Sequence, residues 1–226
     1  MTNNSTPHLP ADYDEQVRRT IPYYDAIHAE TIELVRSLDK PPRLWLDTGC
    51  GTGAMVKRAL GQMPGTEFIL ADPSDSMLEV ARESLKGEAR VHILGPLQTQ
   101  DLRGRVDGEP EVITAIQCHH YLPRTEREEA VMTCYDLLSP GGTFITFENV
   151  RPLTAAGTTM GKRSWHRFLV SNGRTPEEAE AHLARFDQEY FPITVEEHLD
   201  LLRRAGFGTV ELFWYSRMQV GLYGMK

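Results

Sequence analysis

An apolar run that ends in an acid and leads directly into alternating glycines constrains this chain more than any other feature. The run covers residues 44–46 and ends at Asp47, and a helical pattern starts at Ala54. The loop between them contains Gly49, Cys50, Gly51 and Gly53. A strand that enters a helix through glycines brings backbone N–H groups against a nucleotide-like ligand, because glycine has no Cβ to block the approach. The pattern predicts an α/β domain with a ligand at the loop.

The loop alone fits two classes of cofactor. Gly49, Gly51 and Ala54 have the spacing of dinucleotide-binding enzymes. Asp47 distinguishes the classes, because a carboxylate is unfavourable beside a pyrophosphate but suits the ammonium and sulfonium groups of S-adenosylmethionine. Asp47 is also placed to cap the loop by accepting its N–H bonds. A nicotinamide-dependent oxidoreductase is the weaker alternative, since the chain has no hydride-transfer constellation beyond the loop.

A second short buried strand also ends in an acid. The strand begins at Glu67, its apolar residues are 68–71, and Asp72 follows them. An acid at this position accepts hydrogen bonds from ribose hydroxyls, so we expect Asp72 to bind the ribose. Pro73 comes next, and a helix begins at Asp75. Met77 on the apolar side of that helix is expected either to pack on the adenine or to belong to the core.

The remaining elements continue the alternation of strands and helices. They are a strand at 111–116, a loop at 117–122, an amphipathic helix at 125–138, the turn Ser139–Gly142, a strand at 143–148, and two closely spaced strands at 208–215 and 218–225. With the acid–glycine loop, this series resembles the class I S-adenosylmethionine-dependent methyltransferases from about Tyr13 to Lys226, apart from Arg151–Phe191. The resemblance implies one domain over 1–226, with a doubly wound, mostly parallel seven-stranded Rossmann-like sheet. It also implies a C-terminal antiparallel hairpin and S-adenosyl-L-methionine as the cofactor.

The N-terminal region resembles methyltransferases, and the related carboxy-S-adenosylmethionine synthase, in having an arginine shortly before Pro-x-Tyr. In those proteins the arginine and the tyrosine close over the cofactor. By position, Arg19 would meet the cofactor carboxylate, with the bidentate geometry of a guanidinium, and Tyr24 would cover the methionine portion. We therefore expect lid helices over 13–40, preceded by a loose tail at 1–12.

Two departures from the family pattern affect the expected site. Members carry an acid after the third strand near the adenine amino group, whereas this chain has Pro96 there. Adenine recognition is then expected from the backbone near Leu97 or from Gln98. Ile116 and Gln117, at the end of the fourth strand, are also expected at the cofactor. Ile116 stands where the synthase has an asparagine, and no arginine matches its carboxylate anchor, so methyl transfer is favoured over the synthase reaction.

Methyl transfer is an in-line displacement on carbon that needs neither a metal nor an enzyme nucleophile. Holding the acceptor and the methyl group in line supplies most of the acceleration. An acceptor that loses a proton also needs a base. His119 and Glu148 leave strand ends on the ligand side of the sheet and are the candidate bases; a helix cap and a bond to the lid are the structural alternatives. His120 and Tyr121 are expected at the substrate.

The segment Arg151–Phe191 is an insertion where we expect the substrate to be recognised. It is predicted to form two lid helices, with Asn172–Gly173 as the turn and Thr175 capping the second helix. Trp165 and His166 are expected to line the substrate site.

Composition narrows the choice of partner and compartment. The net charge of −8 argues against broad nucleic-acid binding, so a small molecule is favoured, although Lys162, Arg163 and Arg167 leave a tRNA substrate open. No apolar run is long enough to span a bilayer, and the start of the chain has no signal pattern. The three cysteines are widely spaced, which suggests neither a disulfide framework nor a zinc site and fits the cytoplasm.

Overall fold

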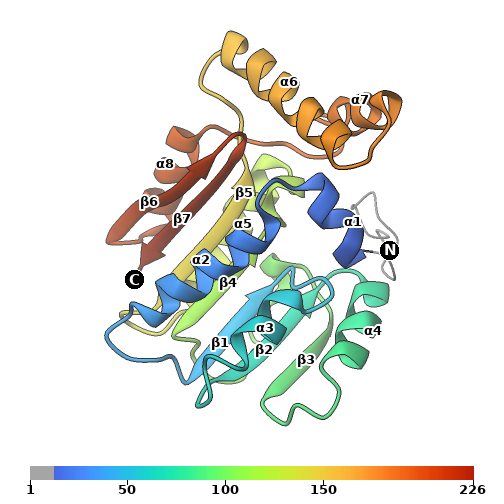
Figure 1. Ribbon diagram of the computed structural model, residues 1–226. Helices are drawn as coiled ribbons and strands as arrows, with labels where there is room; N and C mark the ends of the chain where they lie inside the picture. The colour runs from blue at the N-terminus through green and yellow to red at the C-terminus, as the bar shows by residue number, and fades with distance from the viewer. Residues whose placement is uncertain (1–12) are drawn as a thin grey trace.

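One seven-stranded sheet forms the centre of the computed structural model, which describes residues 13–226 (Figure 1). The strands are β1 Leu44–Thr48, β2 Glu67–Asp72, β3 Val91–Pro96, β4 Val112–Ile116, β5 Thr143–Asn149, β6 Thr209–Ser216 and β7 Gln219–Met225. Their order is β3-β2-β1-β4-β5-β7-β6, and β7 runs antiparallel between β5 and β6. The other pairs are parallel. The predicted doubly wound sheet with a C-terminal antiparallel hairpin is confirmed, whereas the expected tail at 1–12 lies outside the described residues.

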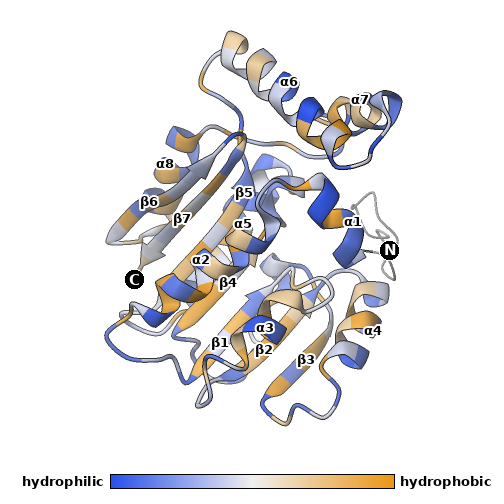
Figure 2. Ribbon diagram, in the orientation of Figure 1, coloured by the Kyte–Doolittle hydropathy of each residue, from blue (hydrophilic) through white to orange (hydrophobic). Residues whose placement is uncertain are grey.

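Helices cover both faces of this sheet. They are α1 Tyr13–Thr20, α2 Tyr24–Arg36, α3 Ala54–Ala59, α4 Asp75–Ser84, α5 Arg124–Leu137, α6 Ala155–Ser171, α7 Pro176–Ala184 and α8 Val195–Ala205, with short 3₁₀ turns η2 Thr99–Asp101 and η3 His119–Tyr121. Successive side chains of a strand point to opposite faces. In β1, Leu46 packs in a cluster with α5 and α8, and Trp45 in a cluster with α2, α3 and α4. Figure 2 shows the apolar colouring concentrated on the central strands. None of the described helices combines the length and apolarity needed to cross a bilayer.

Parallel pairing brings the carboxyl ends of three strands to one edge. Asp47 in β1 lies beside Leu70 in β2 and Thr114 in β4. The loops that follow these strands therefore meet above the same edge, which is where ligands bind in open α/β sheets.

The N-terminal segment departs from the lid helices expected over 13–40. Ile32 and Val35 on α2 belong to the apolar cluster on the sheet face, so α2 is a core helix. α1 extends toward the carboxyl edge, where Tyr13 reaches the larger cavity described below, and of α2 only residues near its start, Tyr24 and His28, reach the smaller one. The amphipathic spacing of α2 buries one of its faces on the sheet, which explains why it does not form a lid.

The insertion forms the two predicted helices, α6 and α7. Thr175 caps α7 in a capping box with Glu178, as its position before a proline predicts. α6 and α7 lie beyond the ends of β4 and β5, at the top of Figure 1, and α6 also contacts α1. Trp165 and Leu169 of α6 join Ile27 of α2 in a third apolar cluster, which fastens the insertion to the body.

Candidate cofactor and acceptor site

The glycine loop approaches the loop after β4 too closely for a side chain at position 49. Gly49 has φ of 64°, and a Cβ there would lie 2.5 Å from Cβ of Cys118. Gly51 has φ of 54° and faces open space instead, with its N–H donating to Oδ2 of Asp72 at 2.9 Å. Gly53 is the N-cap residue of α3, and a Cβ there would lie 2.8 Å from Cδ1 of Leu85. It lines neither the larger nor the smaller cavity at this edge of the sheet.

Asp72 connects the ends of β1 and β2. Its Oδ2 accepts from Gly51, and its Oδ1 accepts from the N–H of Ser74 at 2.8 Å. Burial raises the pKa of this carboxyl, although both hydrogen bonds oppose the shift. Pro73 and Met77 line the same cavity as Asp72, and their contact with the ribose and the adenine stays a prediction.

A cavity of about 340 Å³ opens at this carboxyl edge. Its lining comes from α1, the ends of β1, β2 and β4, the start of α5, and the end of the insertion. The predicted residues among the lining are Gly49, Gly51, Asp72, Pro73, Met77, Gln98, Ile116, Gln117 and Tyr121. Sequence reasoning missed Tyr13, Cys118, Leu122, Pro123, Glu126 and Phe191. Phe191 is placed by tertiary contacts, since its N–H donates to the carbonyl of His120 at 2.7 Å, and no sequence signal marks it.

A smaller chamber of about 30 Å³ lies on the other side of the glycine loop. Tyr24, Asp47 and Cys50, which are predicted to bind the cofactor, line it together with His28 from α2, which was not predicted. Oδ1 of Asp47 accepts from the hydroxyl of Thr114 at 2.6 Å. Burial raises the pKa of Asp47 to about 7, and the nearby Asp72 adds to the shift.

The expected bases His119 and Glu148 do not line the cavity, and this corrects the sequence prediction. Glu148 is fully buried. Its Oε1 accepts hydrogen bonds from the N–H of His119 and the hydroxyl of Thr146. Its Oε2 accepts from the N–H of His120 and lies 2.6 Å from Nδ1 of the same residue. Burial alone would raise the pKa of Glu148, but His120 and its neighbours lower it to about 2. Four partners leave the carboxylate no place for an acceptor's proton.

The two histidines are likewise held by the fold. Nε2 of His119 lies 3.1 Å from the hydroxyl of Thr99, and its ring stacks on Phe144. Burial lowers the pKa of His119 to about 4. Nε2 of His120 lies 3.1 Å from Nδ2 of Asn149, and its Nδ1 contacts Glu148, so both ring nitrogens have partners. His120 does not line the larger cavity.

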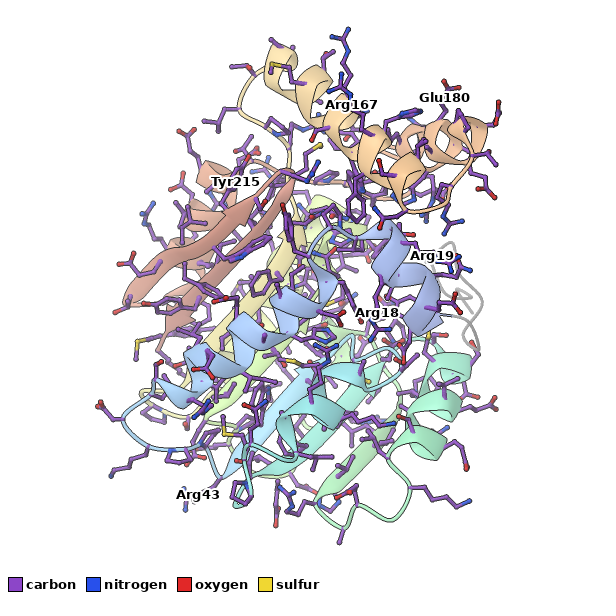
Figure 3. All side chains as sticks on the ribbon, viewed as in Figure 1. Arg18, Arg19, Arg43, Arg167, Glu180 and Tyr215 are labelled. Carbon is purple, nitrogen blue, oxygen red and sulfur yellow. The ribbon has the colours of Figure 1, made fainter. Side chains whose placement is uncertain are left out.

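Four other predicted residues lie away from both cavities. Arg19 is half-exposed at the edge of α1 (Figure 3). Its Nη2 lies 2.7 Å from Oε1 of Glu15, with which it pairs. Leu97 packs against the core cluster beneath α5. Trp165 is buried and donates to the carbonyl of Thr20 at 2.8 Å, so it fastens α6 and does not form a substrate wall. His166 lies on a shallow outer surface of the insertion.

Comparison with known proteins agrees with this fold. A family model described as a methyltransferase domain matches residues 46–144. Proteins named carboxy-S-adenosyl-L-methionine synthase are similar along most of their length. The one from Alteromonas mediterranea is 26% identical, and the match covers 90% of this chain and 84% of the relative. The one from Chromohalobacter salexigens is 28% identical, and the match covers 91% of this chain and 76% of the relative.

Solved structures of methyltransferases share the architecture. The carbon methyltransferase CurJ superposes with a TM-score of 0.65 at 16% identity, covering 96% of this chain and 60% of its own. A putative O-methyltransferase from Nostoc punctiforme superposes with a TM-score of 0.64 at 17% identity, covering 89% of this chain and 56% of its own. The N-methyltransferase NodS from Bradyrhizobium japonicum, in complex with S-adenosyl-L-homocysteine, superposes with a TM-score of 0.61 at 12% identity. This match covers 90% of this chain and 87% of NodS. The chain thus spans little more than half of the first two proteins.

In its fold and in the methyltransferase domain matched at residues 46–144, the chain is similar to the class I S-adenosylmethionine-dependent methyltransferases. Its cofactor is S-adenosyl-L-methionine, as the acid–glycine loop predicts. The residues present fit this group, because Asp72 offers a buried carboxylate beside the glycine loop and Met77 an apolar surface in the same cavity.

Proposed function

We propose that this enzyme transfers the methyl group of S-adenosylmethionine to a small molecule bound in the larger cavity. The observation that supports this proposal is the continuity of that cavity. It runs from the glycine loop and Asp72 to Tyr121 and Phe191 under the insertion. One ligand at the glycine loop and a second beside Tyr121 would therefore meet inside a single cavity, which is what an in-line transfer requires.

The lining favours an acceptor that is neutral or cationic. Asp72 and Glu126 are carboxylates, and no lysine, arginine or histidine lines the cavity among residues 13–226. The wall away from the glycine loop is apolar and aromatic, with Leu122, Tyr121 and Phe191. A buried anion would have no counter-charge there, whereas an amine or a neutral ring with an apolar body would be well accommodated.

Positioning supplies the catalysis in this proposal. His119 and Glu148 are sequestered, and burial raises the pKa of Tyr121, so its phenol stays protonated. Glu126 is the carboxylate on the acceptor side of the cavity, at the start of α5. For an acceptor that loses a proton, Glu126 is the group that would receive it.

The first test is calorimetric titration with S-adenosylmethionine, S-adenosylhomocysteine and NAD. We expect the first two to bind and NAD not to bind. Turnover is then measured with acceptors of matched size that are anionic, neutral or cationic. Turnover confined to the anionic members would contradict the proposed acceptor class. The E126Q variant should lower turnover on amine acceptors while leaving cofactor affinity nearly unchanged.

Carboxy-S-adenosylmethionine synthesis is the second candidate, favoured by the names of the similar full-length relatives. It requires the chain to hold an additional carboxylate. Arg185 contacts the Tyr121 phenol, but its Nε lies 2.6 Å from Oε2 of Glu189, so this guanidinium is already paired. Mass spectrometry of ligand released from purified protein distinguishes the two candidates, since the synthase would carry a cofactor heavier by one carboxyl group.

We also infer a cytoplasmic location and a small-molecule substrate in preference to tRNA. All three cysteines are free thiols, which fits a reducing compartment. The cationic cluster of Lys162, Arg163 and Arg167 lies on the outer surface of α6, away from the cavity (Figure 3 labels Arg167). Filter binding of total tRNA at physiological salt tests the second inference, and tight binding would contradict it.

A further inference from the structure

One buried arginine connects two segments that meet beside the larger cavity. Arg127 of α5 is 2% exposed and does not itself line the cavity. Its Nε donates to the carbonyl of His119 at 3.0 Å, and its Nη2 donates to the carbonyls of Leu122, at 3.0 Å, and Phe191. The carbonyl of His120 lies 3.5 Å from the same Nη2. Arg127 therefore ties η3 and the residue after it to the end of the insertion.

The carbonyls that Arg127 binds belong to the acceptor side of the cavity. Tyr121, Leu122 and Phe191 line that side, and we call them the acceptor wall. A turn as short as η3 cannot satisfy all of its own carbonyls, and the guanidinium supplies donors to them. The N–H of Phe191 also donates to the carbonyl of His120, at 2.7 Å. The two halves of the acceptor wall, which are far apart in the sequence, are thus held at one spacing.

An arginine suits this position for a physical reason. Its guanidinium is planar, presents five N–H donors in a fixed fork and has no acceptor. Each buried carbonyl left without a donor would cost about 1–3 kcal/mol. Burial lowers the pKa of Arg127, and the charges of Glu148 and Glu197 oppose that shift. A lysine would keep the positive charge, but its three donors leave one nitrogen and do not reproduce the fork.

We infer that Arg127 is a positioning residue that sets the spacing of the acceptor wall and thereby the size of the acceptor that the enzyme methylates. The inference rests on the proposed function, because it takes the space beside Tyr121 as the acceptor site. Transfer in line depends on placement, and a displacement of about 1 Å can lower a rate by about 10²-fold. Asp72 and Gly51, which are expected at the cofactor, hold each other without Arg127, so the acceptor wall can change while cofactor binding stays the same.

Competition between two acceptors tests this inference in the full chain. Benzylamine and 1-naphthylmethylamine carry the same ammonium group on a narrow and a wide aromatic body. Both are mixed with enzyme and S-adenosylmethionine, and mass spectrometry measures the two methylated products. The ratio of the two rates does not depend on how much of the enzyme is folded. A variant that only destabilises the protein therefore leaves this ratio unchanged.

The test variant is R127K, and R90K is its matched control. Arg90 is a partly buried arginine whose guanidinium also donates to three backbone carbonyls, those of Leu60, Met63 and Thr66. It lines neither the larger nor the smaller cavity. Circular dichroism melting checks that each variant is folded. R127Q, which keeps two N–H donors, replaces R127K if the lysine variant does not fold.

We expect the wild type to favour the narrow amine and R127K to lower this preference by about tenfold, with R90K unchanged. The affinity for S-adenosylhomocysteine, measured by calorimetry, should stay within about twofold of the wild type in both variants. F191A should lower the preference as well, and R127K should add little to it in the double variant, because both changes act on the same wall. An R127K preference equal to that of the wild type, or a full additional effect in the double variant, overturns the inference.

Hydrogen exchange adds a readout that needs no acceptor. The amide of Phe191 should exchange faster in R127K than in the wild type or R90K, because the carbonyl contacts that hold it beside η3 are weakened. An unchanged rate at this amide also overturns the inference. A wild type that binds S-adenosylhomocysteine but methylates neither amine overturns the proposed acceptor class instead, and the exchange rate at Phe191 then decides whether Arg127 holds the acceptor wall.

Discussion

Oε2 of Glu148 lies 2.6 Å from Nδ1 of His120, and both side chains are almost completely removed from solvent. The pair joins the end of β5 to η3, the turn that carries Tyr121 into the cavity wall. The same carboxylate also accepts both backbone N–H groups of the two histidines. Glu148 therefore positions the acceptor side of the site without touching it.

Replacing Glu148 should destabilise the protein. Removing a buried carboxylate from its hydrogen-bonded partners costs about 3–5 kcal/mol, because the remaining groups stay desolvated. We expect E148A to lower the free energy of unfolding by that amount at pH 7, measured by urea denaturation, and E148Q to lower it less. E180Q on the exposed face of α7 is the control and should change little. An E148Q variant with normal stability and cofactor affinity but no turnover would restore Glu148 as a catalytic base.

The same carboxylate predicts an acid limit to stability. The pKa of Glu148 is about 2 in the folded protein and about 4.3 in an unfolded chain, so the folded state binds fewer protons. Its contribution is complete above the unfolded value and is lost as the pH falls from about 4.3 toward 2. Unfolding curves between pH 3 and 6 should show this slope, and it should be smaller in E148Q.

Asp47 predicts the opposite dependence at higher pH. Its folded pKa of about 7 lies above the unfolded value of about 3.9, so the ligand-free protein should lose stability as the pH rises from about 4 to 7. The loss should be on the order of 2–4 kcal/mol. D47N should remove this slope and be more stable than the wild type at pH 8. Bound S-adenosylhomocysteine should reduce the slope, since its ammonium would stabilise the charged carboxylate; a ligand-independent slope would contradict that contact.

Asp72 should contribute strongly to cofactor affinity. D72A removes the acceptor expected for the ribose hydroxyls and leaves the Gly51 N–H without its partner. We expect at least a tenfold weaker affinity for S-adenosylhomocysteine by calorimetry. D75N, three residues further on at the exposed start of α4, should bind normally. Equal affinity of D72A and the wild type would mean that the ribose lies elsewhere.

Arg19 tests whether α1 rearranges on binding. As its guanidinium is exposed and paired with Glu15, R19A should change the affinity for S-adenosylhomocysteine by less than about twofold. A tenfold loss would show that α1 moves to bring Arg19 onto the cofactor carboxylate. Hydrogen exchange with and without ligand provides a second readout. We expect ligand binding to protect residues 13–20 even if Arg19 does not contact the ligand, because Tyr13 lines the cavity.

The fold could be predicted because it depends on local sequence signals, and contacts between distant residues did not change the elements that these signals indicate. The acid–glycine loop, the capping of α7 by Thr175 and the apolar strands each depend on neighbours in the sequence. The positions of Asp47, Asp72 and Met77 beside the cavities could be predicted for the same reason, because these residues occupy fixed positions after strands. Their contacts with the cofactor stay predictions.

The acceptor side was less predictable because it depends on burial. A histidine or carboxylate at a strand end has the same sequence signature whether it faces the cavity or a buried partner. The side chains of His120 and Glu148 are buried against each other, Glu148 also accepts from Thr146, and the ring of His119 contacts Thr99. Phe191 reached the cavity only through contacts with distant elements, and His28 gave no sequence signal on α2.

The contact between Gly49 and Cys118 limits how the enzyme can be redesigned. Cβ and Sγ of Cys118 occupy the place that a side chain at position 49 would need. The loop after β1 and the loop after β4 are therefore interlocked parts that can be exchanged only as a pair. A graft of either loop alone from a relative is expected to fit only where glycine is kept at 49 and a small residue at 118. Libraries aimed at new acceptors should accordingly vary Tyr121, Leu122 and Phe191, and leave position 118 unchanged.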